Sequence, residues 1–138
     1  MSRLAPLLVL SGAFYAAACG SGGGGDDGAH APGSYERMYE ALCNVETESR
    51  SGDLQAGRAE FFDNAHQDLH ELAAEAAHSD RAAAARLLDA KQAVEGGLDT
   101  MSSGLPRDVA DLIAAAGNAI LAVGDPEPTP CTARGVEQ

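Results

Sequence analysis

Asp63, His66 and His70 have the residue types and the spacing of a metal-ligand set. Helical residues four apart share one face, and Asp63 stands one turn before His66. Two imidazoles at this spacing can chelate a divalent transition metal ion, with the carboxylate as a third ligand. His66 and His70 also border an apolar stripe, where histidines often only bridge core and solvent. We prefer the structural interpretation and keep metal binding as the alternative.

Known catalytic and metal motifs fail in this sequence. The zincin motif is His-Glu-x-x-His. After His70-Glu71, the position of the second histidine is occupied by Ala74. A di-iron bundle needs two Glu-x-x-His elements, and the chain supplies only Glu75 to His78. Tyr39 or Glu40 of an earlier helix could add to the histidine cluster, but the pattern does not show that they meet. We therefore expect a protein that is not an enzyme.

Four helices are predicted to position these residues. Cap residues, turns and apolar spacing place them at about 35–48, 54–78, 81–101 and 106–123. Ser34 and Asp53 are the expected N-caps of the first two helices. Ser79-Asp80 separates the second helix from the third, with one long kinked helix as the alternative.

Each predicted helix carries one apolar stripe. The first reads Tyr35, Met38, Tyr39, Leu42 and Cys43, and the second reads Phe62, Ala65, Leu69, Leu72 and Ala76. The third reads Leu87, Ala90, Val94, Gly97 and Met101, and the fourth reads Val109, Leu112, Ile113, Ala116, Ile120 and Val123. One stripe per helix is the pattern of elements that pack around a shared core. We expect an all-α fold, a small up-down-up-down four-helix bundle.

Cys43 and Cys131 are predicted to form a disulfide bond. Proline at alternate positions after Gly124 favours an extended tail that can travel about 20 Å before Cys131. In an antiparallel bundle, this reach brings the tail alongside the first helix. A metal site made of these two thiolates lacks the close cysteine spacing of zinc sites.

The charge of the 138-residue chain limits its partners. Its formal net charge is −12, which repels nucleic-acid phosphates and anionic lipid headgroups. The same field attracts cations, so the expected partners are a protein, a cationic ligand or a metal ion.

The first 25 residues have the build of an export signal. Arg3 precedes an apolar run that is too short to span a bilayer, and Ala16-Ala17-Ala18 leads to Cys19. Here the sequence resembles the lipobox of bacterial lipoproteins, although Ala16 stands where that family more often has leucine. The resemblance implies cleavage before Cys19 and a lipid on that cysteine. The alternative is an ordinary secretory signal that leaves Cys19 unmodified.

Four regions follow from these observations. They are a signal peptide at 1–18, a lipidated cysteine with a disordered Gly/Ser/Asp tether at 19–33, a helical bundle at 34–124 and a Pro-rich tail at 125–138. The expected location is outside the cytoplasm, anchored to the plasma membrane or to an outer membrane. The expected function is a non-enzymatic binding or interaction module, with divalent metal binding as the alternative.

Overall fold

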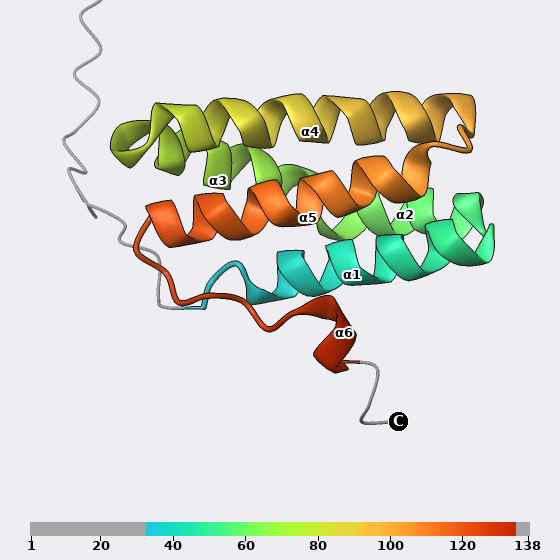
Figure 1. The fold of residues 1–138 in the computed structure, drawn as a ribbon, viewed down its shortest axis with the longest axis horizontal. Coiled ribbons are helices and arrows are strands. Elements are labelled where there is room, and N and C mark those ends of the chain that lie inside the picture. The colour runs from blue at the N-terminus through green and yellow to red at the C-terminus, as the bar shows by residue number, and fades with distance from the viewer. Residues whose placement is uncertain (1–32, 135–138) are drawn as a thin grey trace, which may run out of the picture.

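A computed structural model describes residues 33–134, and these residues form helices and turns without a strand. The helices are α1 (Glu36–Ser51), α2 (Leu54–Asn64), α3 (His66–Ser79), α4 (Arg81–Thr100), α5 (Leu105–Ala122) and the short α6 (Cys131–Arg134). In Figure 1, α1, the α2–α3 pair, α4 and α5 alternate in direction. The predicted all-α, up-down-up-down bundle is confirmed.

Aspartate caps divide the chain at two of the predicted places. The Asp53 carboxylate accepts a hydrogen bond from the Ala56 amide at 3.1 Å and starts α2. The Asp80 carboxylate accepts hydrogen bonds from the Ala82 and Ala83 amides, each at 2.9 Å. Asp80 itself is extended, so α3 and α4 are separate helices. The alternative of one long kinked helix is wrong.

The predicted second helix is broken at Ala65, whose φ and ψ are −124° and −35°. Its first half, α2, packs mainly on α1, whereas α3 packs mainly on α4. The break lets each half follow a different neighbour. The single helix expected over 54–78 is therefore corrected to two.

The predicted stripes are wrong at two positions. Phe62 is 37% exposed and Phe61 is buried in its place, because the break at Ala65 changes which face of α2 meets the core. Met101 is 45% exposed and follows the last residue of α4 as its C-cap. Its backbone is in the left-handed region, with φ at 49°. Leu98 fills the core there.

The ends of α1 also differ from the prediction. Ser34 is not a cap, since its hydroxyl donates to Asp125 Oδ2 at 3.5 Å and α1 begins two residues later. The helix continues to Ser51 rather than to 48, and Gly52 ends it with φ at 87°. A left-handed residue of this kind is what glycine allows at a helix end.

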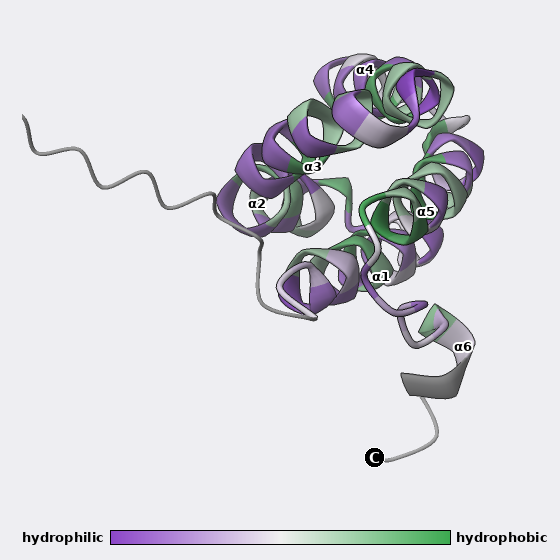
Figure 2. Cartoon of the chain, turned by 90° about the vertical axis from the view of Figure 1, so that its left-hand side faces the viewer, coloured by the Kyte–Doolittle hydropathy of each residue, from purple (hydrophilic) through white to green (hydrophobic). Residues whose placement is uncertain are grey.

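The core is mainly aliphatic and includes many buried alanines. Apolar sides of the helices turn inward and hydrophilic sides turn mainly outward (Figure 2). The largest fully buried side chains come from all five long helices: Phe61, Met38, Leu42, Leu69, Leu72, Leu87, Leu98, Leu105, Leu112, Val45, Val94 and Val109. Within residues 33–134, no helix is long and apolar enough to cross a membrane.

Three predicted regions lie outside the described residues. They are the signal peptide, all of the tether with Cys19 except Gly33, and the last four residues of the tail.

Candidate functional site

The structure brings His66 and His70 together but does not join Asp63 to them. The two imidazole rings are 5.0 Å apart, centre to centre, and nearly perpendicular. His66 opens α3 while Asp63 lies in the last turn of α2, so the break at Ala65 separates them. Among the residues that the structure describes, no three His, Cys, Asp or Glu side chains gather as a group that could hold a metal ion.

His66 belongs to a partly buried charge cluster that the sequence reasoning missed. Its Nε2 lies 2.8 Å from Glu95 Oε1, and Lys91 Nζ lies 2.7 Å from the same oxygen. Lys91 is only 3% exposed. The sequence contained a sign of this pair. Lys91 occupies the buried stripe of α4, and Glu95 follows one turn later, at the i+4 position.

The charges of this cluster control the titration of Glu95. Partial burial of the carboxyl would raise its pKa, but the hydrogen bond and the charge of Lys91 oppose this effect. Hydrogen bonding and charge from His66 act in the same direction as Lys91. The net result is that the pKa of Glu95 lies below its ordinary value.

A polar groove of about 450 Å³ lies along α1 and the α2–α3 junction. Its walls carry four carboxylates, three carboxamides and one guanidinium. The lining residues are Arg37, Glu40, Ala41, Asn44, Glu60, Asp63, Asn64, Gln67 and Asp68. Glu40 and Asp63, which the sequence could not place together, are both among them.

Two amides hold a carboxylate of this groove in place. The Asn44 side chain donates from α1 to Glu60 Oε1 at 3.1 Å. The Asn64 side chain donates to Glu60 Oε2 at 2.8 Å. Both oxygens of Glu60 are therefore fixed, and one of these bonds links α1 to α2.

We compared the chain with known proteins. No family model, curated protein or solved structure matches it.

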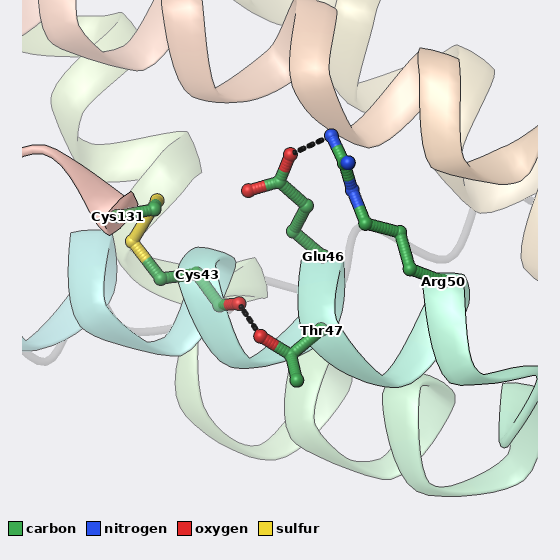
Figure 3. The surroundings of a disulfide bond; sticks show 5 residues. All are labelled: Cys43, Glu46, Thr47, Arg50 and Cys131. Carbon is green, nitrogen blue, oxygen red and sulfur yellow. Dashed lines mark hydrogen bonds and ion pairs between the residues drawn. A yellow bond between two sulfur atoms is a disulfide. The ribbon is translucent and has the colours of Figure 1, made fainter. Parts of the chain in front are cut away.

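The predicted disulfide pair is in place. Cys43 Sγ and Cys131 Sγ are 2.03 Å apart and join α1 to α6 across 88 positions of sequence (Figure 3). The tail leaves α5 at Gly124, whose φ is 87°, and passes along α1 to reach α6 (Figure 1). Pro128 is buried on this path.

A side-chain hydrogen bond joins the start of α1 to α3. The Tyr35 hydroxyl donates to Glu75 Oε2 at 2.7 Å. Burial raises the pKa of Tyr35 above its ordinary value, and the hydrogen bond and charge of Glu75 raise it further. An ordinary tyrosine is already protonated at physiological pH, so the raised pKa extends the alkaline range over which the hydroxyl can donate to Glu75.

Proposed function

We propose that this chain is a lipid-anchored binding module outside the cytoplasm, which engages an ammonium or guanidinium group in the groove along α1. The groove carries this proposal. Its four carboxylates outnumber its single arginine, and its volume of about 450 Å³ suits a small ligand or one side chain of a partner. Fixed carboxylate oxygens lose little freedom on binding, which favours affinity.

Two other observations support the location. Disulfides persist in oxidising compartments outside the cytoplasm, and Cys43 and Cys131 lie at bonding distance. The residues before Cys19 resemble a lipobox. A lipid on Cys19 would hold the module at a membrane that its own acidic surface does not favour.

Calorimetric titration tests the groove, with spermidine and a tetralysine peptide as separate probes. The protein is the chain with Cys19→Ala, in 0.15 M salt. We expect Glu60→Gln with Asp63→Asn to weaken binding by about tenfold, because two nearby charges are lost. Tighter binding of the peptide would indicate a protein partner, and tighter binding of spermidine would indicate a small cation.

The matched control is Asp89→Asn with Asp111→Asn. It removes the same charge from exposed positions of α4 and α5 that do not line the groove. Equal weakening by the two double variants would reduce the effect to general charge attraction and reject the groove.

Membrane fractionation of a bacterial host tests the anchor independently. The full-length chain should sediment with the membranes, whereas the Cys19→Ala chain should become soluble. Unchanged membrane retention of the variant would reject the lipid anchor without affecting the binding experiment.

A divalent metal site is the second candidate function. The observation that favours it is the adjacency of the His66 and His70 rings, 5.0 Å apart. Titration with Cu(II), Ni(II) and Zn(II) should then show tighter binding to the native chain than to His66→Ala with His70→Ala. His78→Ala alters an exposed histidine of the same helix and should bind normally. Equal affinities for native and double-variant chains, or no weakening between pH 7 and 5, would exclude the site.

A further inference from the structure

The two sulfurs of the disulfide differ in access. Cys43 of α1 is buried, with 7% of its surface exposed. Cys131 is half-buried and lines a surface pocket of about 240 Å³ with Glu46, Thr47, Arg50 and Thr132. Figure 3 shows the side chains of Glu46, Thr47 and Arg50 on α1 near the bond. A reagent that enters the pocket therefore meets Cys131.

The charges beside this pocket are paired. Arg50 Nη2 lies 2.7 Å from Glu46 Oε1, one helical turn away. The guanidinium offsets the carboxylate, which would otherwise repel an approaching thiolate. The residues that line the pocket therefore carry no net charge, although the whole chain is strongly acidic.

The disulfide holds the far end of residues 125–134, here called the strap. The helix α6 packs only slightly on the other helices and stands away from the bundle (Figures 1 and 2). Nearer α5, Pro128 of the strap is buried. There the strap forms one wall of a pocket of about 250 Å³ whose other walls include Tyr39, Ile113 and Leu121.

We propose that the pocket beside Cys131 is a thiol-exchange site for a dithiol reductant, and that exchange there releases the strap from α1. The attacking thiolate forms a bond to Cys131 Sγ while the Cys43–Cys131 bond breaks. The electron pair leaves on Cys43 Sγ, which takes up a proton. The second thiol of the donor, as its thiolate, then attacks the donor sulfur that is bonded to Cys131. Cys131 Sγ leaves as a thiolate and takes up a proton. The donor leaves as a disulfide.

The released strap uncovers the apolar surface beneath it. The partly buried Ile113 loses the wall formed by Pro128 and Pro130, and the pocket that it shares with the exposed Leu121 opens. This device goes beyond the proposed cation groove and uses a different part of the molecule. It can be tested with purified protein, whether or not Cys19 carries a lipid.

The first experiment locates the attacked sulfur. The native, oxidised chain with Cys19→Ala is exposed briefly to limiting glutathione, quenched with acid and mapped by mass spectrometry. We expect the mixed disulfide on Cys131. An adduct mainly on Cys43, or no adduct unless denaturant is added, would overturn the proposal.

A pocket-filling variant tests the route of attack. Thr47→Trp should slow reduction by dithiothreitol about tenfold, because the indole occupies the approach to Cys131. Thr100→Trp is the matched control, since both threonines are exposed and both donate to the carbonyl four residues earlier. Equal rates for the two variants, with normal thermal unfolding of both, would reject this pocket as the entry.

Hydrogen exchange tests the release. After reduction and alkylation at low temperature, amides of the strap should exchange as fast as those of an unstructured chain. Amides of α2 to α5 should stay protected, but less than in the oxidised chain, because the crosslink also stabilises the whole domain. Unchanged protection of the strap would show that the disulfide does not hold it in place. Complete loss of protection in α2 to α5 as well would show that the bond keeps the whole domain folded rather than holding the strap, and would also contradict the proposal.

Discussion

Lys91 carries its ammonium group into the bundle, and Glu95 is the partner that offsets the cost of this burial. An unpaired charge at a site 3% exposed would be strongly destabilising. Glu95 Oε1 receives both Lys91 Nζ and His66 Nε2, so one carboxylate serves α3 and α4 together. The cluster therefore joins two helices through charge as well as through packing.

Replacement of Glu95 by glutamine tests this pairing. We expect Glu95→Gln to lower the free energy of unfolding by about 1–2 kcal/mol at pH 7, because a nearly buried ammonium loses its counter-charge. Urea unfolding measures the change. Lys91→Met combined with Glu95→Gln should recover part of the loss, since an apolar chain replaces the unpaired ammonium. A double variant that is less stable than Glu95→Gln alone would contradict this account.

The same variant has a predictable pH dependence. The pKa of Glu95 is lower in the folded chain than the value of about 4.3 for an unfolded glutamate, so folding favours the ionised carboxyl. The resulting stability is present above that value and is lost as the pH falls through the folded pKa. The native chain should therefore exceed Glu95→Gln in stability at pH 6 and lose this advantage toward pH 3. An equal difference at both pH values would contradict the pairing.

At the scale of the helix, two adjacent glycines of α4 have different environments. A Cβ added at Gly96 would meet no atom within 4 Å, whereas one at Gly97 would lie 3.0 Å from Leu105 Cδ1. Gly97 therefore allows the start of α5 to approach α4 closely. Both glycines weaken the helix intrinsically, but only one has a reason in the packing.

Alanine substitution separates these two effects. Gly96→Ala should raise the free energy of unfolding by about 0.5–1 kcal/mol through helix propensity alone. Gly97→Ala should give less than this gain, or a loss, because Leu105 must move. Thermal unfolding by circular dichroism measures both. Equal stabilisation by the two variants would mean that the close approach of α5 is unimportant.

At the scale of the molecule, the disulfide compensates for a thin core. The bundle buries few aromatic rings and relies on aliphatic side chains and alanine. In the chain-entropy model, a crosslink over 88 positions lowers the conformational entropy of the unfolded chain. This raises the free energy of unfolding by about 4–5 kcal/mol. For a domain of this size such a term is a large share of the total stability.

Removal of the crosslink should lower stability without changing the fold. We expect Cys43→Ala with Cys131→Ala to lose about 2–5 kcal/mol in urea unfolding. The helical circular dichroism signal at low temperature should stay close to that of the native chain. A loss below 1 kcal/mol would show that the bridge does not constrain the unfolded chain as the model requires.

The sequence by itself determined the all-α class, the antiparallel order of the helices and the cysteine pair. Local signals fix these features: Asp53 and Asp80 satisfy free amides at helix starts, and Gly124 with three following prolines directs the tail back along α1. Only the tertiary structure decided the break at Ala65, because it results from two helix halves packing on different neighbours. The same break exchanged Phe62 for Phe61 in the core and separated Asp63 from His66. Long-range contacts also made the groove and brought His66 of α3 to the Lys91–Glu95 pair of α4, since no local spacing places residues of different helices together.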